Sequence, residues 1–371
     1  MMKDVVNEIK NVKIRYENGK RKCKCCYCNK EFNHSVVPHL KKVHPEKWNN
    51  WCEYFVERYN EGLSYKKIMN LATTKNDNLI LSWTVIEKEI KNSIGQGKFE
   101  FKLPDKKIEK WSPSPNEFKI PRTTIWDFPK RGNWAVHRND YRGNWAPQIP
   151  RALIQKYTNE PGEIIFDGFL GGGTTAIEAW LNDKRCIGID ISSFAIKIAN
   201  KLIEEMDKRS KDKDSFFRLK EEYRPIIIQD DIKNTLKILR DLNIDKVDLI
   251  CTHPPYLDVL KYSKEDGDLS LISDEKLFFK EMIKIAKVFY KILKENKYCC
   301  ILIGDVRKKG KFIPIGFNLM KCFQEEGFEL EDIIIKLQHK DGSTEFYHNK
   351  ESLKNLIAHE YLFIFKKVEK K

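Results

Sequence analysis

The sequence lacks the features that mark membrane-bound and exported proteins. No run of apolar residues is long enough to span a bilayer, although 41% of the residues are hydrophobic. The opening segment, MMKDVVNEIK, also lacks the apolar stretch of a signal peptide. We therefore expect a globular protein of the cytoplasm, associated with the nucleoid and without a membrane partner.

Acidic residues are too few to balance the basic ones. The 371-residue chain has 54 Asp and Glu against 68 Lys and Arg, which gives a formal net charge of +14. Such a field favours a polyanionic partner, because each Lys or Arg at a phosphate releases condensed counterions. A Lys-rich solubilising surface is the alternative explanation of the same composition.

The ten cysteines are distributed unevenly, and four of them crowd into six residues near the start of the chain. In a cytosolic protein this clustering predicts metal ligation rather than disulfides. The segment CKCCYCNKEFNHSVVPHLKKVH has thiolates and imidazoles at a spacing that suits tetrahedral Zn²⁺ and resembles a C₂H₂ zinc finger. The predicted structural zinc ligands are Cys25, Cys28, His39 and His44. Cys23 and Cys26 have the same spacing as the first pair, so either register is open, and an unmetallated cluster is the alternative.

The composition changes along the chain predict a modular organisation. We expect a zinc finger over residues 1–50, a helical module over 51–95, a Lys- and Pro-containing linker over 96–120 and a catalytic domain over 121–371. The helical module contains LSYKKIMNL and SWTVIEKEIKN, which would form either a DNA-binding helix-turn-helix or a plain connector.

The long carboxy-terminal region predicts an α/β fold. Short β-branched runs (EIIFD, RCIGID, PIIIQD, VDLICT and YCCILIGD) alternate with amphipathic helical segments such as FFKEMIKIAKVFYKILKEN, residues 278–296. This alternation indicates βαβ units and a doubly wound, mostly parallel sheet of the Rossmann-like kind. Ligands of such sheets bind outside the carboxyl ends of the strands.

A glycine-rich turn follows the first of these strands in EIIFDGFLGGGTTAIEAW. Its glycines allow the backbone to approach a ligand closely, and Thr174 begins a helix whose amides point at that ligand. The next strand ends at Asp190, where a carboxylate can bind two ribose hydroxyls, and a third ends in the acidic pair Asp230-Asp231. No G-x-x-x-x-G-K-[ST] segment is present, which disfavours a P-loop nucleoside triphosphatase.

The segment DGFLGGGTTAIEA resembles the cofactor motif of amino-group DNA methyltransferases, usually written D-P-F-x-G-S-G-T-T. Gly168 and Gly172 replace the proline and the serine, and neither change removes a ligand group. Upstream, YRGNWAPQIPRALIQKYT resembles the segment that packs over the methionine part of the cofactor in these enzymes. The resemblance implies an S-adenosylmethionine pocket formed by Asp167, Phe169, Gly171, Gly173, Thr174, Asp190 and Asp230.

The segment after VDLIC resembles the catalytic motif of the same family, (Asp/Asn/Ser)-Pro-Pro-(Tyr/Phe). It reads Thr252-His253-Pro254-Pro255-Tyr256. The lone pair of an exocyclic base amine is delocalised into the ring, so two acceptors on its hydrogens would redirect that lone pair towards the methyl group. Prolines hold such a turn rigid, and the aromatic can stack on a flipped base.

His253 departs from the family pattern. A neutral imidazole can still accept an amino hydrogen, whereas an imidazolium cannot, which predicts that activity falls below about pH 6.5. Alternatively, His253 packs within the turn while Thr252 or a carbonyl accepts the hydrogen.

These features together predict an S-adenosylmethionine-dependent methyltransferase that acts on double-stranded DNA. The Thr-x-Pro-Pro-Tyr frame resembles that of the cytosine-N4 enzymes slightly more, which implies cytosine N4 rather than adenine N6 as the target. Restriction-modification, with a companion endonuclease, or epigenetic marking would be its setting. An RNA amino-methyltransferase and an inactive DNA-binding regulator are the alternatives, and the sequence leaves the recognition site and the oligomeric state open.

Overall fold

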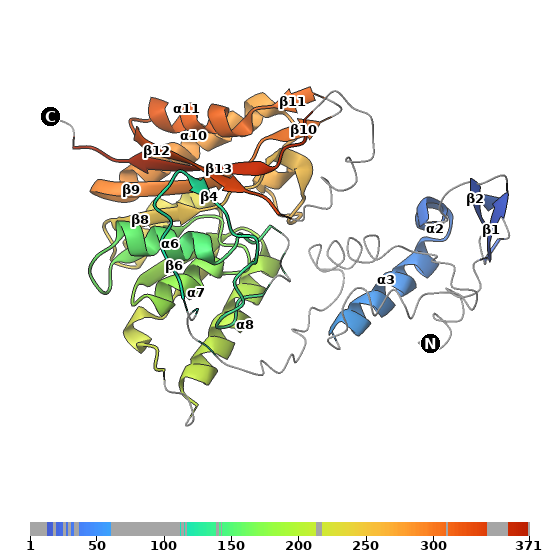
Figure 1. Cartoon of the computed structure of the whole chain (residues 1–371), viewed down its shortest axis with the longest axis horizontal. Helices are drawn as coiled ribbons and strands as arrows, with labels where there is room; N and C mark the ends of the chain where they lie inside the picture. Colours follow the sequence, from blue (N-terminus) through green and yellow to red (C-terminus); the bar gives the residue numbers. More distant parts are fainter. Residues whose placement is uncertain are drawn as a thin grey trace. The chain divides into compact units, whose positions relative to one another are not determined.

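The structure, a computed structural model, divides the chain into unit 1 (Met1–Glu109) and unit 2 (Lys110–Lys371) (Figure 1). The boundary between the units falls inside the linker that we expected over residues 96–120. The described residues are 13–17, 20–24, 27–28, 31–32, 37–60, 112, 115, 117–138, 141, 143–212, 217–308, 311–339 and 355–369.

Unit 1 combines a small antiparallel sheet with two consecutive helices. The strands pair in the order β1 (Lys13–Glu17), β2 (Lys20–Lys24) and β3 (Glu31–Phe32), and the helices are α2 (Val37–Val43) and α3 (Pro45–Asn60). Leu40, Trp51 and Phe55 are fully buried. Proline suits the first position of a helix, so α3 begins at Pro45 and crosses the boundary that we expected at residue 50. The further helices expected from LSYKKIMNL and SWTVIEKEIKN lie outside the described residues.

Unit 2 is built on an eight-stranded sheet, counted over its described residues. Its strands in spatial order are β4 (Ile125–Trp126), β12 (Glu329–Leu337), β13 (His359–Lys366), β9 (Leu293–Ile303), β8 (Val247–Thr252), β5 (Ile164–Asp167), β6 (Arg185–Asp190) and β7 (Ile226–Gln229). All pairings from β9 to β7 are parallel, as is that of β4 with β12, whereas β13 runs antiparallel to both its neighbours. The predicted mostly parallel α/β sheet is confirmed.

Helices cover both faces of this sheet (Figure 1). One face carries α6 (Gln148–Tyr157), α7 (Thr174–Leu181) and α8 (Ser193–Ser210), and the other carries α10 (Glu275–Ile292) and α11 (Ile315–Glu325), with α9 (Thr235–Asp241) in contact with α10. Aromatic side chains from α10, α11 and β13 fill the second layer, where Phe289, Phe323 and Phe365 are fully buried. Short 3₁₀ turns (Glu221–Tyr223, Ile232–Asn234, Leu257–Val259 and Leu269–Leu271) and the hairpin β10–β11 (Val306–Lys308, Lys311–Ile313) complete the unit. Among the described helices, none is long and apolar enough to cross a membrane.

The predicted helix over residues 278–296 is wrong at its end. Helix α10 stops at Ile292, and the next residues start β9, where Leu293 pairs with Val247 of β8. The backbone amide of Asn296 donates to the carbonyl of Lys367 at 2.7 Å. These long-range hydrogen bonds outweigh the local helix propensity of the segment.

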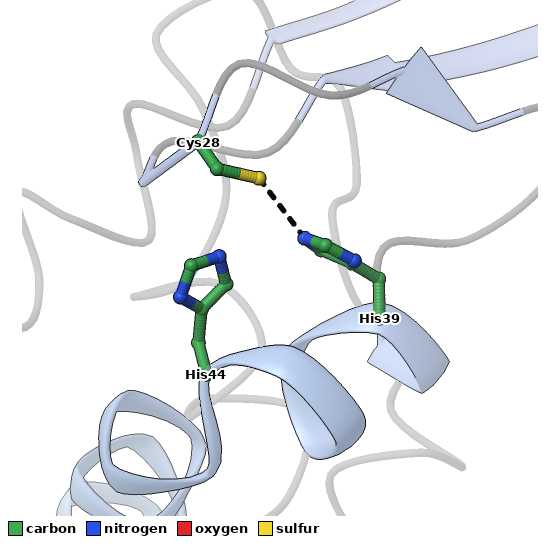
Figure 2. A group of neighbouring side chains, drawn as sticks. All are labelled: Cys28, His39 and His44. Carbon is green, nitrogen blue, oxygen red and sulfur yellow. Dashed lines mark hydrogen bonds between the residues drawn. The ribbon is translucent and has the colours of Figure 1, made fainter.

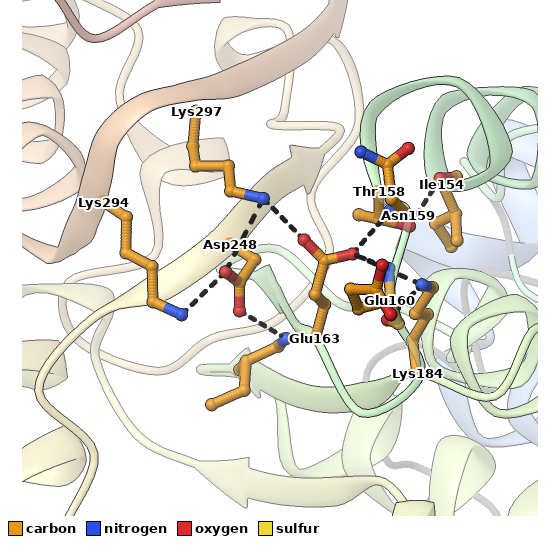
Figure 3. A network of polar contacts seen from close by, with 10 residues as sticks. Ile154, Thr158, Asn159, Glu160, Glu163, Lys184, Asp248, Lys294 and Lys297 are labelled. Carbon is orange, nitrogen blue, oxygen red and sulfur yellow. Dashed lines mark hydrogen bonds and ion pairs between the residues drawn. The ribbon is translucent and has the colours of Figure 1, made fainter.

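Charged side chains join the starts of β5, β8 and β9, at the edge opposite to the strands' carboxyl ends (Figure 3). Asp248 is 5% exposed, accepts from the backbone amide of Ile164 at 2.9 Å and pairs with Lys294 Nζ at 2.7 Å. Glu163 pairs with Lys297 Nζ at 2.5 Å. This ionic network holds the parallel strands in register and leaves their other ends to the site.

Candidate active site

A cavity lies at the carboxyl ends of the parallel strands, where sheets of this class bind their ligands. It encloses about 730 Å³ of space, counting its open mouth. Its walls come from the segments that follow β5, β6, β7 and β8, together with two loops. The first loop contributes Tyr141, Gly143, Asn144 and Trp145, and the second contributes Tyr262, Gly267, Asp268 and Leu269.

The glycine-rich turn after β5 forms one wall. Gly171 and Gly173 have φ values of +54° and +84°, which are strained for residues with a side chain. The Gly171 amide donates to Asp190 Oδ2 at 2.7 Å, and Gly173 caps α7, whose first residue Thr174 is 3% exposed. Gly171 and Phe169 line the cavity, while Gly173 and Thr174 support the turn from outside its lining.

Asp190 ends β6 with its carboxylate at the cavity. Oδ2 accepts from Gly171 and Oδ1 accepts from the amide of Ser192 at 2.9 Å, so each oxygen keeps a lone pair for a ligand. Burial raises the pKa of Asp190 to about 7, although both amide hydrogen bonds oppose the shift. The carboxylate is thus costly to ionise until hydroxyl donors of a ligand satisfy it.

Asp167 is a connection between the two sequence motifs rather than part of the cavity lining. It is 1% exposed, and its oxygens accept from Thr175 and Thr252, each at 2.5 Å. Burial raises its pKa to about 6, while these hydroxyls and the Phe169 amide lower it. Because Thr252 is fully buried and donates to Asp167, it ties the end of β8 to the end of β5.

The two aspartates of the acidic pair after β7 differ in their position relative to the cavity. Asp231 lines the cavity, and Asp230 does not belong to the lining. The Asp230 carboxylate instead accepts from the Asp231 amide and from Asn234 Nδ2, both at 2.7 Å. Asp231 also pairs with Lys233 Nζ at 3.1 Å, but because it alone of the two lines the cavity, the geometry favours Asp231 over Asp230 as the residue that meets a ligand.

His253 and its neighbours form the opposite wall. The imidazole is stacked on Trp145, with ring centroids 5.8 Å apart and planes inclined by 23°. Its Nε2 lies 2.7 Å from the Tyr256 hydroxyl, which donates to Glu360 Oε1 at 2.7 Å. Glu360 also pairs with Lys336 at 3.0 Å.

Burial lowers the pKa of His253 to about 4, although Glu360 acts in the opposite direction. The imidazole is therefore neutral at physiological pH. Our expectation of a loss of activity below about pH 6.5 used the pKa of an exposed histidine, and the lower pKa of the buried ring moves that predicted loss to a lower pH.

The turn that carries the histidine is constrained on both sides. Pro254 is buried and Pro255 lines the cavity. The Tyr256 hydroxyl lies between His253 and Glu360 and is hydrogen-bonded to both. Leu257 is fully buried and adopts φ +52°, which a side chain rarely tolerates. Packing around Leu257 thus holds a strained turn next to the motif.

Glu178, which is completely buried on α7, anchors the segment RGNWAVH, residues 131–137. Its oxygens accept from Trp134 Nε1 at 2.7 Å and Arg151 Nη1 at 3.0 Å, and lie 2.5 Å from His137 Nε2. Arg131 Nη1 donates to the carbonyl of Trp145 at 2.6 Å. These contacts fix the loop that brings Trp145 against His253.

The predicted metal ligands are partly described. Cys28, His39 and His44 bring one sulfur and two ring nitrogens within 4.8 Å of one another (Figure 2). Cys28 Sγ lies 3.1 Å from His39 Nε2, and His44 Nε2 is buried without a hydrogen-bond partner among the described residues. Cys25 and Cys26 lie outside those residues, and Cys23 is described only as part of β2.

Comparison with known proteins identifies the class to which this arrangement belongs. The N6_N4_Mtase family, described as DNA methylase, matches residues 7–201 and 247–371. The chain belongs to this family of DNA methylases, which confirms the resemblance seen in the sequence.

Individual relatives match shorter stretches. The type II methyltransferase M.MjaII of Methanocaldococcus jannaschii is 27% identical over 43% of this chain and 28% of its own length. The DNA adenine methyltransferase YhdJ of Escherichia coli is 34% identical over 22% of this chain and 28% of its own. A tRNA (guanine(10)-N2)-dimethyltransferase of M. jannaschii is 34% identical over 31% of this chain and 29% of its own. The chain spans less than a third of each of these relatives.

Among solved structures, TrmN from Thermus thermophilus overlaps 61% of this chain and 50% of that chain. The identity is 15% and the TM-score 0.38, so the overlap is too loose to inform on function.

Proposed function

We propose that this protein transfers a methyl group from S-adenosylmethionine to the exocyclic amino group of a base in DNA. The observation that carries the proposal is the meeting of His253, at the end of β8, with Asp190, at the end of β6, around one cavity. The family assignment supports the same chemistry.

The residues present fit S-adenosylmethionine. Asp190 offers two acceptor oxygens to ribose hydroxyls, and Asp231 offers a carboxylate to the adenine amino group. Gly171 has no side chain, so a ligand can approach the backbone of the turn, and Phe169 lines the cavity beside it. When bound, the cofactor supplies an electrophilic methyl group.

The protein's own contribution is alignment of the nucleophile. His253 accepts one hydrogen of the target amine, which favours the tetrahedral nitrogen whose lone pair attacks the methyl carbon. Trp145 stacks on the ring of His253 and keeps it in place. Holding the amine and the methyl group at attack distance lowers the barrier mainly by proximity.

DNA is the proposed substrate, with cytosine N4 favoured over adenine N6, in restriction-modification or epigenetic marking. The family and the M.MjaII and YhdJ matches support DNA. The match to a tRNA dimethyltransferase keeps RNA as the second candidate.

The test is incubation of the purified protein with methyl-labelled S-adenosylmethionine and unmethylated duplex DNA, with RNA in parallel. Mass spectrometry of the digested nucleosides should find labelled N4-methylcytosine in DNA, and Asp190→Ala should abolish the label. Label in RNA alone would replace the substrate, and cofactor binding without any transfer would favour a regulator.

Unit 1 fits a structural zinc ion. A thiol and two imidazoles converge, and the buried Nε2 of His44 is a ligand atom without a described partner. Zinc prefers such donors in tetrahedral sites, so a second cysteine from Cys23, Cys25 or Cys26 would complete the set. We also propose that this module binds zinc and increases the affinity of the protein for DNA.

A further inference from the structure

A buried ion pair lies behind the catalytic motif. Glu360 on β13 is 7% exposed, and its Oε2 lies 3.0 Å from Nζ of Lys336 on β12. An ion pair in such a place is no better for stability than apolar residues of similar volume. Its position beside Tyr256 and His253 suggests a use in the site instead.

The charges of Glu360 and Lys336 determine which side chain donates in each hydrogen bond from Glu360 to His253. Burial opposes ionisation of Glu360, but Lys336, His253 and the Tyr256 hydrogen bond together lower its pKa, so the group is a carboxylate that only accepts. The single hydroxyl proton of Tyr256 therefore points to Glu360. His253 Nε2, 2.7 Å from the same hydroxyl, must then donate to its oxygen.

Gly143 competes for the same imidazole. The ring of His253 also forms a hydrogen bond with the backbone of Gly143, and this bond raises the pKa of His253. Because Nε2 faces Tyr256, a proton shared with Gly143 would lie on Nδ1. A neutral imidazole has one ring proton, so only one of the two partners can hold it.

We propose that Lys336, Glu360 and Tyr256 are positioning residues that keep the proton of His253 on Nε2, so that Nδ1 accepts a hydrogen of the target amine. This inference rests on the proposed amino-methyltransferase function. It also explains how a histidine can replace the Asp, Asn or Ser of the family motif.

The isosteric substitution Glu360→Gln reverses the direction of the hydrogen bonds between residue 360, Tyr256 and His253. In Glu360→Gln the amide oxygen turns to Lys336, which can only donate, so the amide nitrogen faces Tyr256 and donates to it. The tyrosine hydroxyl must then donate to His253 Nε2, which leaves the ring proton on Nδ1. Shape and packing remain almost unchanged.

The first readout is the tautomer itself, measured by nitrogen NMR of the full-length, isotopically labelled protein. His253→Asn identifies the signal among the eight histidines. We expect a protonated Nε2 and an unprotonated Nδ1 in the unchanged chain, and the reverse in Glu360→Gln. A protonated Nδ1 in the unchanged chain would overturn the inference.

The second readout is the rate of methyl transfer at saturating S-adenosylmethionine. Glu360→Gln should lower this rate on the order of 100-fold, as loss of a preorganised hydrogen-bonding group does, with cofactor affinity unchanged. In a His253→Asn background, where no tautomer exists, the same change should cost less than about threefold, by the logic of a double-mutant cycle. Equal losses in both backgrounds would show a structural role and overturn the proposal. The NMR result does not depend on methyl transfer, so failure of the proposed function would be recognised separately.

Discussion

The carboxylates of the site differ in charge state because their neighbours differ. Among the described residues no cation pairs with Asp190, and burial raises its pKa to about 7, whereas Lys336 helps to lower the pKa of Glu360. The same two effects, burial and a nearby cation, therefore disfavour ionisation of Asp190 in the absence of a ligand and favour ionisation of Glu360.

Asp190 gives the protein a pH dependence that His253 does not. A protonated Asp190 loses an acceptor, so the affinity for S-adenosylmethionine should fall about tenfold per pH unit below pH 7. His253 stays neutral down to its pKa of about 4, so the rate at saturating cofactor should be flat through pH 6.5. Calorimetric titrations and initial rates between pH 5.5 and 8.5 measure both, with Asp190→Asn as the control that flattens the first. A midpoint near 6.5 in the saturated rate would contradict this view of His253.

The acidic pair after β7 offers a matched comparison. Asp231→Ala should weaken cofactor binding by about 10- to 100-fold, the usual cost of a lost charged hydrogen bond. Asp230→Ala should leave binding within about threefold, because that carboxylate bonds only to the turn among the contacts described. Calorimetry on the two variants decides between them, and a larger loss in Asp230→Ala would restore our sequence-based assignment.

At the scale of helices and strands, local patterns predicted those elements whose partners follow in the chain. The runs EIIFD, RCIGID, PIIIQD and VDLICT became β5 to β8, because β-branched residues bounded by turns suit buried parallel strands. The strands β12 and β13 and the end of α10 escaped, since their pairing is antiparallel or long-range and leaves no local period. Glu360 was missed for the same reason, although a charge beside the apolar run YLFIF was a visible signal.

Substitutions in the ionic network at the starts of β5, β8 and β9 should lower the stability of unit 2 and leave its cofactor affinity unchanged. Asp248→Asn removes a buried charge that joins β5, β8 and β9, and should lower the free energy of unfolding by about 2 kcal/mol. For a unit of this size that is a Tm lower by roughly 4–8 °C. Lys294→Ala, at a partner with 46% exposure, should cost less than about 1 kcal/mol. Calorimetric melting tests both, and a change in cofactor affinity would show that the network reaches the site.

At the scale of the whole molecule, the net charge of +14 belongs to two units with separate cores. Unit 2 holds the cavity, so its affinity for S-adenosylmethionine should not need unit 1. The zinc-finger segment of unit 1 is too short to form a large hydrophobic core, and ligation of zinc would add the folding energy that it lacks.

Loss of the zinc ligands should therefore separate cofactor binding from DNA binding. The unchanged chain should contain one zinc ion by elemental analysis, and Cys28→Ser or His44→Gln should lose it. Cofactor affinity should then stay within about twofold, while DNA affinity should fall at least about tenfold, with a shallower dependence on salt because fewer phosphates are contacted. Cys52→Ser, at a buried thiol of α3 outside the metal cluster, is the control for loss of a cysteine in the same unit. If the zinc-free variants bind DNA as tightly as the unchanged chain, the grip on DNA lies in unit 2, and the zinc module serves another partner.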